Sequence, residues 1–224
     1  MSLFLVLLTF AVLIILDLVK SSRRGTRLAT STMKQPRKDE GNAERYYHPG
    51  HLWVLVRSSE EVTVGVDDFA QRVVGRLSSI KLPEQGTRVQ QGQPFVTLRH
   101  GEKTLTQVAP VSGVVREVNS KLMNDPTIVN SSPIQRGWIA KIVPTNLEVE
   151  CRNLLRGISA AHWEEAVRNQ LIQRFLSSVQ PVLQDGGMIA DNISDLLSLG
   201  DWEGFVNEFF PNTATWNDEN KTKN

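Results

Sequence analysis

The side chains that are best suited to react or to bind a group lie around one predicted hairpin, in the stretch FVTLRHGEKTLTQVAPVSGVV from Phe95 to Val115. Its tip reads RHGEK and places Lys103 directly after Glu102, and a lysine on an exposed turn can carry a covalently attached group. His100 at the same tip suggests a metal ligand, together with the two histidines of YYHPGHLW. Their spacing does not suit a ligand pair, and no cysteine pattern accompanies them, so no metal site is predicted.

Catalytic nucleophiles are not indicated elsewhere in the chain. Ser112 precedes a glycine in PVSGVV but lacks the Gly-x-Ser-x-Gly setting that exposes a reactive hydroxyl. Cys151 is the single cysteine, which excludes a disulfide within the chain and a cysteine-based metal site. No glycine series followed by Lys-Ser or Lys-Thr forms a phosphate loop. The sequence therefore predicts no catalytic residues and a protein that is not an enzyme.

Composition and charge favour a globular domain with appendages. The chain has 224 residues, of which 40% are hydrophobic, which is enough for a real core. With 25 basic and 24 acidic residues the net charge is +1, so the overall electrostatic field of the protein does not favour nucleic acid as a partner.

The N-terminal segment LFLVLLTFAVLIILDLV, residues 3–19, is apolar and spans about 26 Å as a helix at ~1.5 Å per residue. A transmembrane helix is therefore predicted for residues 1–20, with the bilayer contacted by residues 3–19. Basic residues follow the segment, namely Lys20, Arg23, Arg24 and Arg27. This flank predicts a single-pass protein with its N-terminus outside and its soluble domains on the cytoplasmic side. The polar stretch 21–45 is expected to be a basic linker.

Residues 46–157 carry the pattern of a small β barrel or sandwich. Short runs rich in Val, Ile and Leu alternate with turn residues, in HLWVLV, EVTVGV, PFVTL, GVVREV and WIAKIV. The segment DDFAQRVVGRL has a near-helical spacing of apolar residues, so a short helix capped by Asp67 or Asp68 is predicted there. Trp53 and Trp138 are expected to pack in or around the core.

Five blocks carry a family resemblance: HLWVLV, VTVGVDDFAQRVVGRL, LPEQGTRVQQGQPF, VAPVSGVVREVN and NDPTIVNSSPIQRGWIAKI. In order and spacing they resemble the H protein of the glycine cleavage system, a lipoyl-domain relative, over residues 51–142. The resemblance implies a flattened β barrel of two small sheets. It also implies a lysine at a hairpin tip whose lipoyl group shuttles a methylamine intermediate between enzymes, and a structural hydrogen-bonding role for His51.

The register of the hairpin departs from that family. The family's tip resembles ESVKA, with the modified lysine seven residues after the position of Phe95 and seven before that of Ala109. Both counts lead to Glu102, which cannot form the amide, while Lys103 stands one place later. One step along a hairpin turns a side chain away from its former direction. The sequence therefore predicts no lipoate cofactor, with Lys103 as the alternative attachment site.

Residues 158–212 are predicted to form a helical appendage. SAAHWEEAVRNQLIQRFLSSV has a helical apolar stripe with Ser159 as its cap, and ISDLLSL and DWEGFVNEFF indicate two shorter helices, the last capped by Asp201. Its aromatic side chains exceed what so short a segment buries alone; they are Trp202, Phe205, Phe209 and Phe210. They either pack on the barrel or form a docking surface for a protein partner. Residues 213–224 are predicted to be disordered.

The fold class predicted is mainly β, an H-protein-like flattened barrel with an N-terminal transmembrane helix and a C-terminal helical appendage. The functional hypothesis is a non-catalytic, membrane-anchored module that serves a membrane-associated complex as a structural or protein-interaction subunit. The alternative is a lipoyl-type carrier that uses Lys103. A groove for a small ligand, or for the lipoyl arm of another protein, is a third option.

Overall fold

The computed structural model of the chain describes residues 44–177 and 192–210. The predicted transmembrane helix, the predicted C-terminal tail and all but the last two residues of the predicted linker lie outside these ranges. Among the described residues, no helix combines the length and the apolar composition needed to cross a membrane.

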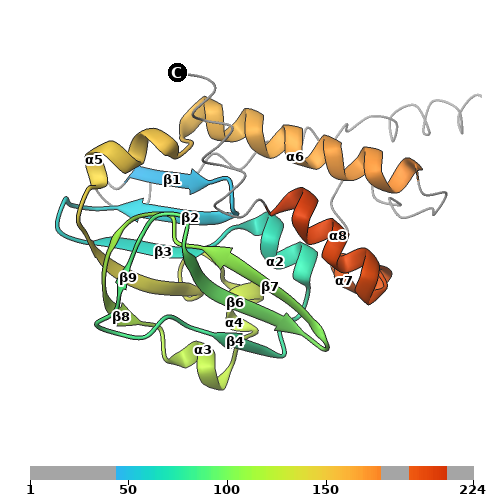
Figure 1. Cartoon of the computed structure of the whole chain (residues 1–224), viewed down its shortest axis with the longest axis horizontal. Helices are drawn as coiled ribbons and strands as arrows, with labels where there is room; N and C mark the ends of the chain where they lie inside the picture. The colour runs from blue at the N-terminus through green and yellow to red at the C-terminus, as the bar shows by residue number, and fades with distance from the viewer. Residues whose placement is uncertain (1–43, 178–191, 211–224) are drawn as a thin grey trace, which may run out of the picture. The chain divides into compact units, whose positions relative to one another are not determined.

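The strands of the described residues form two antiparallel sheets (Figure 1). They are β1 (Glu44–His48), β2 (Leu52–Val56), β3 (Val62–Val66), β4 (Ser79–Lys81), β5 (Arg88–Val89), β6 (Pro94–His100), β7 (Lys103–Val108), β8 (Gly113–Val118) and β9 (Trp138–Pro144). The larger sheet has the order β1-β2-β3-β9-β8-β5, and the smaller has the order β4-β6-β7. The prediction of a mainly β fold with two sheets is confirmed.

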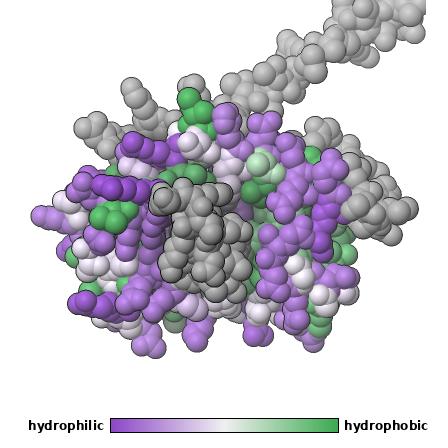
Figure 2. All heavy atoms as spheres, turned by 45° about the horizontal axis from the view of Figure 1, so that its top comes forward, coloured by the Kyte–Doolittle hydropathy of each residue, from purple (hydrophilic) through white to green (hydrophobic). Residues whose placement is uncertain are grey.

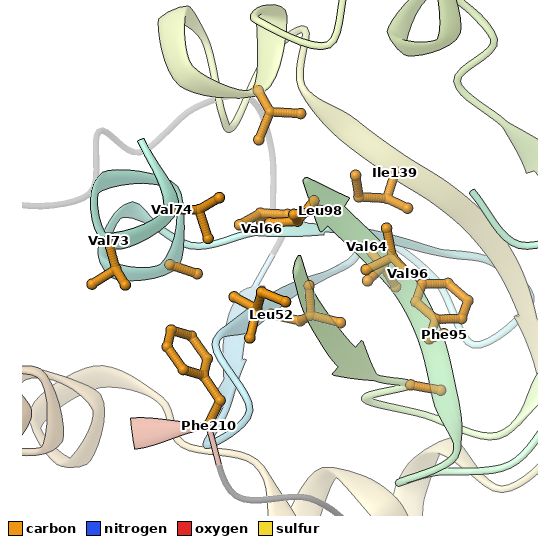
Figure 3. Packing of buried hydrophobic residues seen from close by; sticks show 14 of the residues in the cluster. Leu52, Val64, Val66, Val73, Val74, Phe95, Val96, Leu98, Ile139 and Phe210 are labelled. Carbon is orange, nitrogen blue, oxygen red and sulfur yellow. The ribbon is translucent and has the colours of Figure 1, made fainter. Parts of the chain in front are cut away.

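Both sheets contribute to one hydrophobic core. Val54 of β2 pairs with Val64 of β3, and both side chains are fully buried together with Leu98 of β6 and Ile139 of β9. Figure 3 shows Val64, Leu98 and Ile139 converging from strands that are distant in sequence. The face seen in Figure 2 is mostly hydrophilic, with hydrophobic residues in small separate patches. Each of the five predicted apolar runs coincides with most of one strand, because side chains of each run belong to this core.

Strand β1 was not predicted, and it extends the folded domain to Glu44 instead of Tyr46. Its sequence ERYYH is polar at one end and has no clear alternation. The strand forms because β2 pairs with it along its whole length and because Tyr47 makes an isolated antiparallel bridge with Leu155. Long-range pairing, which local sequence patterns do not report, therefore decides this element.

The helices of the described residues surround the sheets (Figure 1). They are α2 (Asp68–Val74), α3 (Lys121–Asn124), α4 (Ile128–Ser131), α5 (Leu147–Glu150), the 3-10 turn η1 (Cys151–Asn153), α6 (Gly157–Ser177), α7 (Ile193–Leu196) and α8 (Leu199–Phe209). Helix α2 begins as predicted, because the Ala70 N–H donates to the Asp67 carboxylate at 2.8 Å.

Two predicted helix caps were wrong. Helix α6 already begins at Gly157, so Ser159 lies inside its first turn and does not cap it. In α8 the cap is Ser198, whose hydroxyl accepts from the Asp201 N–H at 3.2 Å and donates to the Asp201 carboxylate at 2.6 Å. This reciprocal arrangement resembles a capping box, in which the acidic residue supports the cap from the third helical position.

The C-terminal cover, defined here as residues 192–210, packs on the hairpin side of the barrel. Its four predicted docking residues are buried, with exposed fractions of 3% for Trp202, 0% for Phe205, 4% for Phe209 and 6% for Phe210. Burial of one such side chain contributes about 1.5–3 kcal/mol, which favours packing on the barrel over exposure. The option of a docking surface made of these four residues is therefore corrected: they belong to the core of the domain.

Candidate functional site

The candidate site is the tip of the β6–β7 hairpin, where the sequence placed Glu102 and Lys103. His100 pairs with Lys103 as the last pair of the ladder, so Gly101 and Glu102 form a two-residue turn. Gly101 has φ +57°, at the first central position, where type II′ hairpins require glycine. Glu102 is exposed, and Lys103 is half-buried.

Lys103 is held by the C-terminal cover. Its ammonium group donates a hydrogen bond to the backbone carbonyl of Ser194, a residue that is itself fully buried. The sequence had placed Lys103 on an exposed turn. The structure instead makes Lys103 a bridge between the hairpin tip and the cover.

His100 makes a second bridge at the same tip. Its Nδ1 lies 2.5 Å from the carbonyl oxygen of Arg76, and its Nε2 lies 2.7 Å from a carboxylate oxygen of Asp195. Both partners are acceptors, so the imidazole makes both bonds only when it carries both protons. The ring thereby joins the hairpin tip to the loop after α2 and to α7.

The cover is also tied to the end of α2. The Ser194 hydroxyl donates to the carbonyl of Val74 at 2.7 Å, and the Asn192 side-chain oxygen accepts from the Arg76 N–H at 3.1 Å. Asn192 adopts φ +63°, a left-handed conformation that asparagine tolerates better than most residues. Gly75 faces this residue so closely that a Cβ there would lie 2.3 Å from the Asn192 side-chain oxygen. The turn after α2 is therefore shaped around the cover.

Trp202 makes the third contact between the cover and the hairpin. Its indole Nε1 donates to the backbone carbonyl of Thr104 in β7 at 2.9 Å. The indole is stacked near Phe205, which in turn stacks on Phe209. An aromatic row of α8 is thus anchored to the strand that follows the hairpin tip.

A second polar cluster lies inside the domain, around His51. Its Nδ1 is 2.8 Å from the Asp67 carboxylate, in agreement with the predicted hydrogen-bonding role. Its ring centroid lies 4.4 Å from that of Phe69, 4.8 Å from that of Trp163 and 4.9 Å from that of Phe210. The enclosure by two residues of the helical appendage was not predicted, because no local pattern links these segments. Its Nε2 is buried without a hydrogen-bond partner among the described residues.

His48 is a buried neighbour of this cluster. Its Nδ1 accepts from the Gly50 N–H at 2.9 Å. Burial, assisted by the nearby His51, lowers the pKa of His48 from 6.5 to about 4. The ring is therefore neutral near pH 7 and is needed as a hydrogen-bond acceptor.

The two other tryptophans considered in the sequence pack as expected. Trp53 is 1% exposed, and Trp138 is half-buried, with the Lys141 ammonium 5.2 Å from its ring centroid. Over the described ranges, no group of three or more His, Cys, Asp or Glu side chains is placed to hold a metal ion.

Comparison with known proteins places the barrel in a family. The family model described as Glycine cleavage H-protein matches residues 45–166, which include both sheets and the hairpin tip. The chain therefore belongs to the glycine cleavage H-protein family. The match ends within α6, so the C-terminal cover lies beyond it.

Two relatives agree with this assignment in sequence. A probable glycine cleavage system H protein of Thermococcus kodakarensis is 39% identical over 110 residues, which are 49% of this chain and 81% of the relative. A probable H protein 2 of Sulfolobus acidocaldarius is 38% identical over 117 residues, covering 51% of this chain and 78% of the relative. The crystal structure of an H protein from Mycobacterium marinum is similar with 25% identity and a TM-score of 0.47, covering 55% of this chain and 95% of that structure.

The lipoyl group implied by the family does not fit the residues at this tip. The carboxylate of Glu102 has no amine with which to form the amide. Lys103 has an amine, but it lies one position later and its ammonium is bonded to the Ser194 carbonyl. The site is therefore built to fix the hairpin tip against the cover.

Proposed function

We propose that this chain is a non-catalytic member of the H-protein family that acts as a structural or protein-interaction subunit. The observation that carries this proposal is the hydrogen bond of Lys103 to the Ser194 carbonyl, beside a glutamate at the family's lipoyl position. A carrier needs a mobile arm on a free lysine. A hairpin tip bonded to a cover that lies outside the family match suits a fixed module.

The contacts at the tip oppose a carrier role energetically. A hydrogen bond from a charged donor contributes about 1.5–3 kcal/mol, and the bonds of His100 and Trp202 act in the same direction. Release of Lys103 for attachment would have to overcome these bonds together. The proposal therefore includes the absence of lipoate and of catalysis by this chain alone.

The proposal also includes a membrane location. The apolar segment 3–19 and the basic residues after it favour a single-pass anchor with the barrel on the cytoplasmic side. A tether of this kind suits a subunit of a membrane-associated complex better than a carrier that visits several enzymes. Protease added outside intact cells is expected to spare the barrel, and cleavage there would refute the orientation.

The second candidate is a lipoyl carrier that uses Lys103. Family membership favours it, because the relatives are described as glycine cleavage system H proteins, and a lysine does lie at the tip. In this case the cover would have to move from the hairpin before the lysine is modified.

The deciding experiment is the intact mass of the protein from its native membrane, with a peptide map across residues 95–115. A fully unmodified peptide is expected. The matched control is the Glu102→Lys variant, which restores an amine at the family position and shows whether the host's attaching enzymes recognise this hairpin. A lipoyl adduct on Lys103 in the wild-type chain would overturn the proposal.

A further inference from the structure

A polar hollow of about 420 Å³ lies at the β5 edge of the larger sheet, far along the chain from the hairpin tip. Its lining includes Arg88, Gln91, Ser112, Thr145, Asn146 and Glu150. These residues belong to β5 and the turn after it, to the residue before β8, and to the segment from the end of β9 through α5. Backbone bonds hold these segments together, because β5 pairs with β8 and the Thr145 N–H donates to the Ser112 carbonyl at 3.0 Å.

Glu150 places a carboxylate in this hollow. The residue is only 8% exposed, and one of its carboxylate oxygens accepts from the Ser112 N–H at 2.7 Å. The other oxygen is not sealed from solvent, and no described residue donates to it, so it opens into the hollow. A buried carboxylate is costly unless a cation pairs with it, and no basic side chain of the described ranges pairs with Glu150. This carboxylate is therefore suited to bind the ammonium group of a ligand.

Arg88 supplies the opposite charge. It lines the same hollow and is exposed, and no acidic side chain of the described residues forms an ion pair with it. Arg88 and Glu150 therefore do not pair with each other either, although they share one hollow. Two opposite charges that share a hollow without meeting complement a ligand that carries both a positive and a negative group.

The uncharged part of the lining favours a small, polar ligand. The Ser112 hydroxyl accepts from the Gln91 N–H at 2.8 Å and keeps its own proton to donate. Thr145 and Asn146 are exposed, and the Asn146 side chain does not cap the helix that follows it. Among the lining residues, all of them in the described ranges, the only apolar one is Val89, which is 8% exposed. The hollow thus lacks the apolar anchor on which protein interfaces depend.

We propose that this hollow binds a free α-amino acid with a small polar side chain, in its zwitterionic form. The ammonium group of the ligand pairs with Glu150 and its carboxylate pairs with Arg88, while Ser112 and Asn146 offer hydrogen bonds to its polar atoms. The volume lies at the lower end of the range of small-molecule sites, about 300–1,000 Å³. A ligand of so few atoms is expected to bind with a Kd of about 0.1–10 mM. The inference goes beyond the proposed function and does not depend on it, because none of these residues lies at the hairpin tip.

The test uses the full chain in detergent micelles and L-serine as the probe, followed by a saturation-transfer NMR titration. Two analogues each lack one charge: 3-hydroxypropanoate lacks the ammonium group, and ethanolamine lacks the carboxylate. Saturable binding of L-serine is expected. The first analogue should bind at least about tenfold more weakly, because the buried carboxylate of Glu150 stays unpaired. Ethanolamine should bind about two- to fivefold more weakly, because Arg88 is exposed. Equal binding of all three compounds, or no saturable binding of L-serine, would overturn the proposal.

Protein variants assign the two charges of the ligand to the two side chains. Glu150→Gln keeps an oxygen for the Ser112 N–H but removes the charge, so it should bind L-serine at least about tenfold more weakly and no longer prefer it over 3-hydroxypropanoate. Arg88→Gln should bind L-serine about two- to fivefold more weakly and no longer prefer it over ethanolamine. The matched control is Arg116→Gln, because Arg116 pairs with Glu61 and does not line the hollow; its affinity should be unchanged. A Glu150→Gln variant that still prefers L-serine over 3-hydroxypropanoate would overturn the assignment.

The outcomes distinguish the inference from the proposed function. An unmodified Lys103 without binding of L-serine would refute the amino-acid site and leave the non-carrier function standing. A lipoylated Lys103 would refute the non-carrier function, whatever the titration with L-serine shows.

Discussion

The role of the C-terminal cover in protecting Lys103 can be tested at Gly75, which lies between α2 and the cover. Gly75 has φ +78° and ψ −156°, a region that only glycine occupies readily. An alanine Cβ would also lie 2.3 Å from the side-chain oxygen of Asn192 and 2.9 Å from its Cα. The Gly75→Ala variant therefore strains the turn and pushes the cover away from it.

The change in the free energy of opening of the cover depends on which part of the destabilisation disappears when the cover opens. Backbone strain of about 1–3 kcal/mol persists whether the cover is open or closed. Displacement of Asn192 loses its bonds to the Arg76 N–H and the Arg72 carbonyl, which are worth about 0.5–1.5 kcal/mol each. Opening should thus become easier by about 1–3 kcal/mol, which corresponds to roughly a 5- to 140-fold larger open fraction.

The assay is pulse labelling of lysines with an amine-reactive reagent, followed by peptide mass analysis. Lys103 is expected to react faster in Gly75→Ala by about the same factor as the open fraction rises. Gly86→Ala is the matched control, because Gly86 has φ +85° but nothing within 4 Å of the added Cβ. Equal labelling rates of Lys103 in the two variants would refute the idea that the cover protects this amine.

Two further predictions concern the stability of the domain. Trp202→Phe keeps most of the packing but loses the bond to the Thr104 carbonyl, so it should cost about 1 kcal/mol, whereas Trp202→Ala should cost about 3–5 kcal/mol in chemical denaturation. A similar loss in both variants would contradict the packing role. Because the folded-state pKa of His48 is lowered from 6.5 to about 4, the unfolded chain binds more protons between these values, so stability decreases as the pH is lowered through this window, by up to about 3 kcal/mol. His48→Asn, which retains an acceptor for the Gly50 N–H, should lose this part of the pH dependence; an unchanged slope would show that other groups cause it.

Much of the barrel could be predicted because its signals are local. Short runs rich in Val and Leu located β2 and β3, and the cap at Asp67 follows from the preference of a carboxylate for free N–H groups at a helix start. The wrong cap of α8 has a local reason as well. Both Ser198 and Asp201 can cap, and only the reciprocal bonds in the structure show which residue begins α8.

The sequence alone also predicted that Glu102 occupies the family's lipoyl position, since counting residues along a hairpin needs no tertiary information. It could not determine what happens to Lys103. That lysine meets Ser194 across 91 residues of chain, and His100 meets Asp195 across 95. Such contacts depend on where the aromatic row of α8 finds apolar surface to cover, which is a property of the assembled barrel. The register of the tip could therefore be predicted from the sequence, whereas the bonds of the tip to the cover were decided by tertiary packing.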